Sequence, residues 1–314
     1  MAEFMSLNQS VLICDQVSST LKEILEKNGL KVTYEPEITP EQIAEKIGNF
    51  EVVVVRSRTK MTRELIAKAD KCKIIARVGI GLDNIDQDAA KEKNIRVINA
   101  VEGAITAVAE LVIGLMISMA REIPRADREI RNGNWIKKEL MGSELKGKYL
   151  GIVGLGNIGK RLGRLARALN MNIIGYDVVP IDDEFSKEVG LMKADLDTLL
   201  SSADYVSFHV PLLDSTRHMI NAEKLGIMKK SARIINTSRG GIIDEDALYN
   251  ALKEGNLAGA ALDVFETEPP IGSKLTSLPN FILTPHIGAQ TKEAQLLAAN
   301  IIAEKIIQVI RGII

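Results

Sequence analysis

The sequence predicts an α/β protein made of two doubly wound parallel-sheet domains, one inserted into the other. Three observations support this fold class. The chain has 314 residues, which is too long for one ordinary hydrophobic core. Strand and helix patterns alternate over residues 10–100 and resume at residue 149, as in parallel sheets with crossover helices. A last helical pattern follows the final strand, and it would most simply return to the first domain.

Short apolar runs define the strands of the predicted first domain, at residues 11–13, 31–34, 52–55, 74–76 and 96–98. The helices between them should begin after residues whose side chains can cap a helix, namely Ser18, Thr39, Thr62 and Asp86. Residues 104–130 form one long helical pattern that is apolar on most faces in its first half, so we expect it to be buried. The second set of strands is expected at residues 149–153, 172–176, 205–208, 233–236, 258–262 and 281–283, and the last helix at 291–310.

Composition argues against several classes of protein. The net charge of -1 gives no sign of a nucleic-acid or membrane partner, and no apolar run is as long as a membrane span. Residues 1–10 lack a basic stretch followed by an apolar core, so we expect no secretory signal. Cys14 and Cys72 lie in or beside apolar runs, which indicates buried reduced thiols in a cytoplasmic protein. The three histidines have no zinc-site spacing, so no metal is expected.

The most informative motif lies at the start of the second domain. Glycines at positions 154, 156 and 159 follow the G-x-G-x-x-G spacing, with a strand before them and a helix after them. Gly154 would permit the tight turn, Gly156 the approach of a pyrophosphate, and Gly159 close packing of helix and strand. Asp177 follows 23 residues after Gly154, where a carboxylate can accept hydrogen bonds from ribose hydroxyls. Together these features predict a dinucleotide-binding domain.

Three charged residues near strand ends are candidates for chemistry. Arg239 follows a predicted strand, where its guanidinium could hold a carboxylate, although a surface arginine beside a glycine turn would look the same. His286 lies at a strand end near a predicted hinge at residues 286–291, the second hinge being at 99–103. Glu268 could orient this histidine, but the local sequence does not distinguish it from Glu266.

Five segments, in this order, resemble the D-isomer-specific 2-hydroxyacid dehydrogenase family: V-G-L-G-N-I-G-K, H-V-P-L, N-T-S-R-G-G-I-I-D-E, A-L-D-V-F-E-T-E-P and L-T-P-H-I-G. The resemblance implies a Rossmann NAD-binding domain at residues 101–287, inserted into a flavodoxin-like substrate domain at 1–100 and 288–314. It also implies an oxidoreductase acting on the CH–OH group of a 2-hydroxy acid.

By this resemblance Arg239 anchors the substrate, His286 is the general acid and base, and Glu268 is its partner, since the matched acid directly precedes the proline. The implied NAD contacts are Gly154, Gly156, Asn157, Ile158, Gly159, Asp177, His209, Val210, Pro211, Thr237, Ser238, Arg239, Asp263, His286, Gly288 and Ala289. The implied substrate contacts are Arg56, Ser57, Arg58, Val78, Gly79, Arg239 and His286.

Within the family, the resemblance is greatest to the branch that oxidises 3-phosphoglycerate at the entry of serine biosynthesis. Arg56 and Arg58, with Lys137 or Lys138 after Trp135, could supply charge for a phosphate. Two rivals stay open: a glyoxylate or hydroxypyruvate reductase, which shares the catalytic residues, and an NAD(H)-sensing corepressor-like binding protein.

The segment after the first domain departs from the family pattern. Val101 stands where proline is usual, and Ala104 where an asparagine that touches substrate is usual. The resemblance further implies a homodimer built on the helix around residues 108–119. Because the chain ends after the returning helix, we expect a short form without a regulatory domain.

Overall fold

The computed structural model of this chain describes residues 7–313. Residues 1–6 and residue 314 lie outside the described part. The prediction that residues 1–10 are no secretory signal therefore falls largely outside it. The chain forms two compact units: one contains the chain up to Ala104 together with Ala289–Ile314, and the other is Ile105–Gly288. The chain therefore passes from the first unit to the second between Ala104 and Ile105, and not after residue 100 as predicted. The reason is that the short helix η2 (Val101–Ala104) packs on the last helix, where a Cβ at Gly103 would lie 2.9 Å from the Ala298 Cβ.

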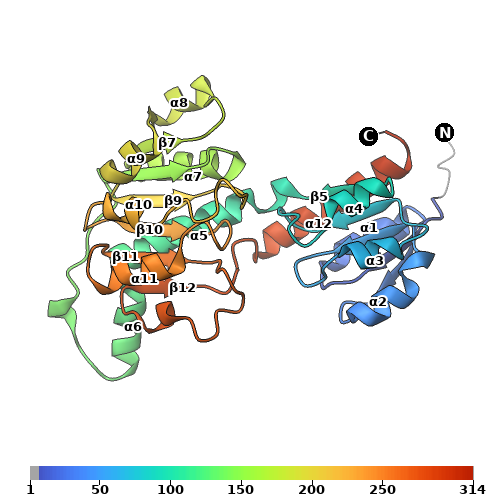
Figure 1. The fold of residues 1–314 in the computed structure, drawn as a ribbon, viewed down its shortest axis with the longest axis horizontal. Helices are drawn as coiled ribbons and strands as arrows, with labels where there is room; N and C mark the ends of the chain where they lie inside the picture. The colour runs from blue at the N-terminus through green and yellow to red at the C-terminus, as the bar shows by residue number, and fades with distance from the viewer. Residues whose placement is uncertain (1–6, 314) are drawn as a thin grey trace. The chain divides into compact units, whose positions relative to one another are not determined.

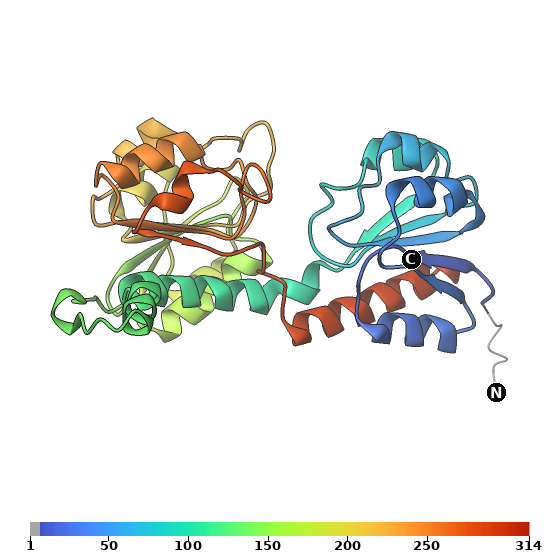
Figure 2. The ribbon, with the colours of Figure 1, turned by 90° about the horizontal axis from the view of Figure 1, so that it is seen from below.

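The smaller unit is a five-stranded parallel sheet in the order β2-β1-β3-β4-β5, with helices on both faces (Figure 2). Its strands are β1 (Ser10–Ile13), β2 (Lys31–Tyr34), β3 (Val52–Val55), β4 (Ile74–Arg77) and β5 (Arg96–Asn99). Helices α1 (Ser19–Lys27) and α12 (Lys292–Ile310) cover one face, where Leu21 and Ile302 join the core. The other face is covered by α2 (Pro40–Lys46), η1 (Ile47–Asn49), α3 (Arg63–Ala67) and α4 (Gln87–Glu92). All five predicted strands are confirmed, and so is the return of the last helix to this sheet.

Three of the four predicted helix caps of this unit are confirmed. The side chain of Thr39 accepts a hydrogen bond from the Gln42 N–H within a capping box. Thr62 and Asp86 accept in the same way from the backbone of Leu65 and Ala89. Ser18 occupies the cap position of α1, but its side chain makes no capping bond, so that prediction is wrong in this detail.

The larger unit is a seven-stranded parallel sheet in the order β12-β11-β10-β9-β6-β7-β8 (Figure 1). Its strands are β6 (Tyr149–Val153), β7 (Asn172–Tyr176), β8 (Met192–Lys193), β9 (Tyr205–Phe208), β10 (Arg233–Asn236), β11 (Gly259–Leu262) and β12 (Phe281–Leu283). Side chains of α5 (Ile105–Ala120), α7 (Asn157–Ala168) and α8 (Asp183–Val189) fill the core on one face. Those of α9 (Leu196–Ser202), α10 (Ala222–Gly226) and α11 (Glu245–Lys253) fill it on the other. The predicted fold class, two doubly wound parallel sheets, is confirmed; the two-residue strand β8 was not foreseen.

The long helix predicted at residues 104–130 is in fact broken. It divides into η2, α5 and α6 (Ile123–Arg131), with Glu122 in the left-handed region at a φ of 50°. Pro124 explains the break, because it has no N–H and its ring would clash with the carbonyl four residues earlier, that of Ala120. The Ala120 carbonyl instead accepts a hydrogen bond from the Ser143 N–H at 2.9 Å.

Helix α5 is the most apolar helix of the larger unit. By length and composition alone, Val101–Ala120 could cross a membrane, but half of this stretch is buried inside the protein. Val112, Leu115 and Met116 form a core with Leu162 and other side chains of the same unit. We therefore interpret α5 as a core helix.

Both cysteines are buried and unpaired, as predicted. Burial raises the pKa of the Cys14 thiol to about 12 and that of Cys72 to about 11. The thiols therefore stay protonated at neutral pH and lack the reactivity of an exposed thiolate. Nothing in their surroundings gives them a part in the chemistry considered below.

Candidate active site

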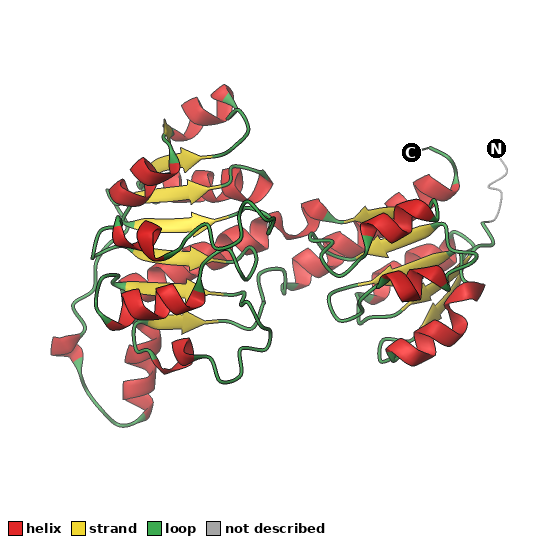
Figure 3. Cartoon of the chain, in the orientation of Figure 1, coloured by secondary structure: helices red, strands yellow, loops and turns green. Residues whose placement is uncertain are grey.

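The predicted site residues of the larger unit follow six neighbouring strands whose carboxyl ends share one edge of the sheet (Figure 3). The strand register pairs Val153 with Tyr176 and Phe208, and Leu262 with Asn236 and Leu283. The residues just beyond these positions are therefore aligned along that edge: Gly154, Asp177, His209, Thr237, Asp263 and Thr284. The strand order reverses between β6 and β9, and ligands of open parallel sheets bind at such a switch point.

The glycine loop has the shape that a dinucleotide requires. Gly154 has a φ of 93°, and a Cβ there would lie 2.7 Å from the His209 carbonyl oxygen. A Cβ at Gly159 would lie 2.1 Å from the Gly154 carbonyl oxygen, so helix and loop touch directly. At Gly156 a Cβ would meet no heavy atom of the described chain within 4 Å, and no side chain caps α7 there. The first amides of α7, at Asn157, Ile158 and Gly159, are thus placed to receive an anion such as a pyrophosphate.

Asp177 ends β7 beside this loop. Its Oδ2 accepts a hydrogen bond from the Leu155 N–H at 2.6 Å, and its Oδ1 accepts one from the Val179 N–H at 3.1 Å. A carboxylate has about four acceptor positions, so two bonds leave capacity for ribose hydroxyls. The residues from 178 to 184 contain three acids and no lysine or arginine. The surroundings of Asp177 therefore fit a ribose without a phosphate.

Two polar side chains on the neighbouring strands complete the fit to a nucleotide. The hydroxyl of Thr237 is buried and has no hydrogen-bond partner among the described residues, as expected for a group that a ligand satisfies. His209 is half-buried with its Nε2 3.0 Å from the Ser207 hydroxyl. Desolvation lowers the pKa of His209 to about 4, so its ring is neutral at physiological pH and can lie against an uncharged aromatic group.

Arg239 lies in a turn that the side chain of Asn236 organises at the end of β10. The buried Asn236 donates from Nδ2 to the Arg239 carbonyl at 2.8 Å and accepts at Oδ1 from the Ser238 N–H at 3.0 Å. Arg239 donates from Nη1 to the Ser238 carbonyl at 2.6 Å. A half-buried guanidinium held in this way has its orientation fixed, which suits bidentate binding of a carboxylate.

His286 and Glu268 form a hydrogen-bonded pair. The distance from His286 Nδ1 to Glu268 Oε2 is 2.9 Å, and Glu268 Oε1 accepts from the Phe265 N–H at 3.2 Å. Both side chains are well exposed, at 49% and 39%, so the pair contributes little to stability. It instead orients the ring, whose Nε2 is the nitrogen that Glu268 does not bind. Glu266, which local sequence did not distinguish from Glu268, pairs with His218 at 2.9 Å.

The backbone of His286 is in the left-handed region, with a φ of 53°, and Asp263 holds it there. The His286 N–H donates to the Asp263 carbonyl at 2.9 Å. The fully buried Asp263 carboxylate accepts from the N–H groups of Ile287 and Gly288, both at 2.8 Å, and from the Thr284 hydroxyl at 2.6 Å. Asp263 is a predicted NAD contact, and in the structure its carboxylate binds the turn that carries His286.

In the smaller unit, the two arginines after β3 have different surroundings. Arg58 donates to the carbonyls of Ile38 and Pro36, both at 2.9 Å, and its Nε lies 3.1 Å from the buried Asp15. This guanidinium is held by the protein itself. Arg56 is half-buried, bonds to the Gln290 side chain, and has a pKa lowered by desolvation. Ser57 is exposed between them.

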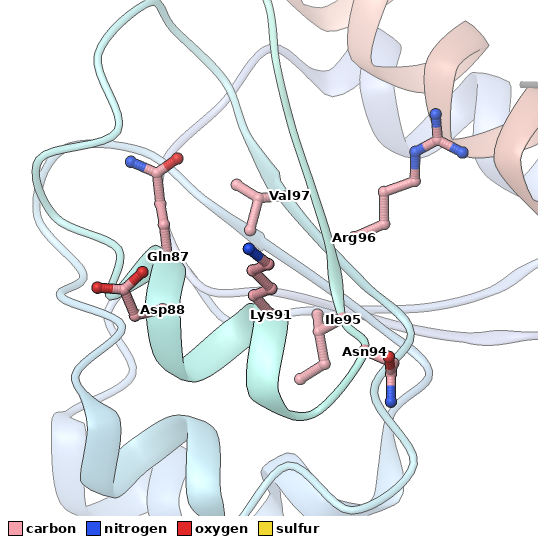
Figure 4. Close-up of a pocket in the computed structure, with 7 residues that line it drawn as sticks. All are labelled: Gln87, Asp88, Lys91, Asn94, Ile95, Arg96 and Val97. Atoms are coloured by element: carbon pink, nitrogen blue, oxygen red, sulfur yellow. The ribbon is translucent and has the colours of Figure 1, made fainter.

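The loop after β4 contributes the remaining predicted substrate residues. The Val78 N–H donates to the Val55 carbonyl at 2.9 Å and is therefore used within the sheet. Gly79 has a φ of 150°, a backbone conformation that favours glycine over residues with a side chain. Of the two backbone amides, that of Gly79 is thus the better candidate for a ligand. This unit has a hollow of about 440 Å³ beside α4 and β5, lined by Lys91 and Arg96 among others, which contains none of the predicted site residues (Figure 4). A second hollow, of about 490 Å³, is lined by Arg58 among others.

Comparisons with known proteins agree with this geometry. The family described as "D-isomer specific 2-hydroxyacid dehydrogenase, NAD binding domain" matches residues 113–288. A D-3-phosphoglycerate dehydrogenase of Methanocaldococcus jannaschii is 48% identical over 96% of this chain and 57% of its own length, so the chain spans little more than half of that relative. A hydroxypyruvate reductase of Thermotoga maritima is 46% identical over 90% of this chain and 92% of its own length. The structure of Aquifex aeolicus D-lactate dehydrogenase complexed with NAD and lactic acid matches with a TM-score of 0.84 and 29% identity, over 97% of this chain and 96% of that one.

Gly240 allows the two loops of this site to touch, and its replacement should separate them. A Cβ at Gly240 would lie 1.9 Å from the Phe265 carbonyl oxygen, which cannot move without its loop. We expect Gly240→Ala to lower the free energy of unfolding by at least ~2 kcal/mol, measured by urea denaturation. Gly226→Ala is the matched control, because a Cβ there meets no described atom within 4 Å. Equal stability of the two variants would contradict the close contact of the loops.

Proposed function

The chain belongs to the D-isomer-specific 2-hydroxyacid dehydrogenase family, and we propose that it uses NAD to interconvert 3-phosphoglycerate and 3-phosphohydroxypyruvate, the first step of serine biosynthesis. The observation that carries the reaction type is the His286–Glu268 pair at the same sheet edge as Arg239 and the glycine loop. An NAD(H)-sensing corepressor would need the nucleotide site but not this histidine pair, so the pair favours the enzyme.

Each catalytic side chain has a separate task in this proposal. Arg239 binds the substrate carboxylate through two parallel hydrogen bonds and fixes the position of the adjacent carbon. His286 accepts the proton of the hydroxyl group at Nε2 during oxidation and returns it to the carbonyl oxygen during reduction. Glu268 keeps Nδ1 protonated and the ring oriented. NAD, when bound, accepts or donates the hydride.

The choice of a phosphorylated substrate rests on two observations. The M. jannaschii relative named for 3-phosphoglycerate is 48% identical over nearly the whole chain. Arg56, a half-buried guanidinium bonded to the uncharged Gln290 rather than fixed to several carbonyls, can bind a phosphate. We assign this role to Arg56 and a structural one to Arg58. A second candidate, hydroxypyruvate reductase, is favoured by the T. maritima relative, which the chain covers over 92% of its length.

We further propose that the protein is a cytoplasmic homodimer, whose interface extends beyond the part expected on α5. Val108, Val112 and Met119 are buried within their own unit, whereas Ile117 of the same helix is 38% exposed. Large apolar side chains are also exposed along α6 and the segment after it: Ile123, Ile130, Trp135 and Met141. An exposed apolar segment of this kind indicates a protein contact. Lys137 and Lys138, which the sequence suggested as possible phosphate-binding residues, lie in η3 (Lys137–Glu139) of the same segment.

Replacement of His286 tests the reaction. His286→Asn should lower kcat about 100-fold or more, because general acid–base catalysis contributes roughly this much. The affinity for NADH, measured by fluorescence titration, should stay near that of the unchanged protein. Near-normal turnover of hydroxypyruvate in this variant would exclude His286 as the acid and base.

Replacement of the two arginines tests the substrate. Arg56→Ala should raise KM for phosphohydroxypyruvate far more than for hydroxypyruvate, because a charged hydrogen bond contributes ~1.5–3 kcal/mol. Arg58→Ala, the matched control, removes the cation paired with the buried Asp15 and should reduce stability without changing the ratio of the two KM values. If Arg56→Ala affects both substrates alike, the hydroxypyruvate reductase assignment becomes the better one.

Asp177 predicts the choice of cofactor. Its carboxylate would repel the 2′-phosphate of NADPH, and like charges in a partly buried site separate the two cofactors by about tenfold or more. The ratio of kcat/KM for NADH to that for NADPH should therefore exceed ten or so. Asp177→Ala should reduce this ratio chiefly by weakening NADH. An NADPH preference in the unchanged protein would show that Asp177 is not the ribose-binding acid.

Charge introduced into the exposed apolar segment tests the dimer. Trp135, 80% exposed, should lose its contact with a second copy when replaced by glutamate, and sedimentation should show a shift from dimer to monomer. Ile271→Glu is the control, since Ile271 is 89% exposed but lies outside this segment. An unchanged sedimentation coefficient for Trp135→Glu would place the interface elsewhere.

A further inference from the structure

A second cluster of titratable side chains lies behind the catalytic loops of the larger unit. His218 Nε2 is 2.9 Å from Glu266 Oε1. The Glu266 N–H donates to Glu245 Oε1 at 2.7 Å, and the Glu245 N–H donates back to Glu266 Oε1 at 3.4 Å. These three residues come from three segments of the chain, before β10, at the start of α11 and after β11. None of them has a role in the reaction as described above.

The histidine of this cluster is fixed directly to the turn that carries Arg239. The His218 N–H donates to the Gly241 carbonyl at 2.7 Å, with His218 in the left-handed region at a φ of 49°. Ile220 continues the attachment as an isolated parallel bridge to Ile243. A residue other than glycine adopts this backbone conformation at a cost, so the surrounding bonds must hold it.

The glutamate of the cluster belongs to the loop that carries Glu268. Gly240 packs against the backbone of Phe265 and Glu266, where a Cβ would lie 1.9 Å from the Phe265 oxygen and 2.7 Å from the Glu266 nitrogen. The N–H of Phe265 in turn donates to Glu268 Oε1 at 3.2 Å. The Phe265–Glu266 backbone therefore supports the substrate-binding turn on one side and the partner of His286 on the other.

Stability is a poor explanation for this cluster. The side chains of His218 and Glu266 are 40% and 35% exposed, and such pairs contribute at most ~1 kcal/mol. Glu245 is close to the carboxylate of Glu266, and burial followed by this neighbouring charge raises the pKa of Glu245. Two facing carboxylates oppose folding rather than favour it. What the cluster does supply is geometry: it joins three loops at one point through the Phe265–Glu266 backbone.

We propose that His218, Glu266 and Glu245 are positioning residues, which lock the Phe265–Glu266 backbone to the Arg239 turn and thereby keep Glu268 directed at His286. This inference rests on the proposed function for its kinetic consequence, but its structural consequence is independent of activity. Loss of the cluster should loosen the hydrogen bond between Glu268 and His286 Nδ1 without unfolding the protein.

Kinetics with hydroxypyruvate and NADH provide the first test. Glu266→Ala should lower kcat about tenfold, since a misplaced catalytic group costs one to two powers of ten. Glu266→Gln should recover most of the lost turnover, because its amide oxygen still accepts the N–H groups of His218 and Glu245. The affinity for NADH and the urea midpoint should stay unchanged in both variants. Lys224→Gln is the matched control, since it removes a 2.7 Å pair with Asp197 that joins α9 and α10 of the same unit.

The order of action is tested in a Glu268→Gln background, where Glu266→Ala should have no further effect on kcat. Independent, multiplicative losses would overturn the proposal, as would a loss of turnover that follows a loss of stability. The ¹⁵N spectrum of the imidazoles gives a readout without catalysis, and three histidines make it simple to assign. We expect the His286 Nδ1 resonance to shift in Glu266→Ala and not in Lys224→Gln. An unshifted resonance refutes the positioning role. If the protein without any substitution reduces no 2-keto acid, the proposed function is refuted, but the spectral test of the positioning role is still valid.

Discussion

The common register of the parallel strands in the larger unit is the constraint on which the site depends. Each crossover returns the chain to the same edge, so residues far apart in sequence, such as Gly154 and Thr284, follow aligned strand ends. The reversal of strand order between β6 and β9 leaves room at this edge for a ligand. The apolar faces of the strands are covered on both sides, which fixes the register and hence the positions of the polar residues beyond them.

The polar groups at this edge are of two kinds, buried side chains that hold the turns and exposed side chains that a ligand can reach. Buried Asn236 and Asp263 bind backbone amides and carbonyls, and so determine the path of the turns that carry Arg239 and His286. Burial makes these bonds costly to break, because each would leave an unpaired polar group. The exposed pair of His286 and Glu268 has the opposite character: it adds little stability, yet its ring nitrogen is accessible to a reactant. The buried side chains thus hold the turns in place, and the exposed side chains on those turns are accessible to a reactant.

The sequence was most informative where local pattern decides the structure. The strands at 172–176 and 205–208 are apolar runs buried on both faces, and Gly154 and Gly159 have positive φ or tight contacts that the motif requires. The helix predicted at residues 104–130 breaks before Pro124, which lies in the sequence between the apolar α5 and the polar α6. Other features depend on contacts that sequence spacing cannot show. Arg58 is bound by carbonyls 20 to 44 residues away, and His218 meets Glu266 across 48 residues. Strand β8, with only two exposed residues, had too little apolar pattern to predict.

The two histidine–glutamate pairs show why a pair alone does not identify a catalytic group. His286 and His218 each lie 2.9 Å from a glutamate oxygen, and both have a left-handed backbone. Their contexts differ in what the rest of the site can use. The His218 side chain bonds through Nε2 to Glu266, and the His218 backbone N–H donates to Gly241 in the turn that carries Arg239. Both contacts are therefore with loops of the protein itself. His286 bonds through Nδ1, so that the proposed reaction takes place at Nε2, and it follows β12 at the edge where Arg239 and the glycine loop lie. In the proposed mechanism the same local chemistry supports the loops at His218 and transfers a proton at His286, and the fold, rather than the pair, makes the difference.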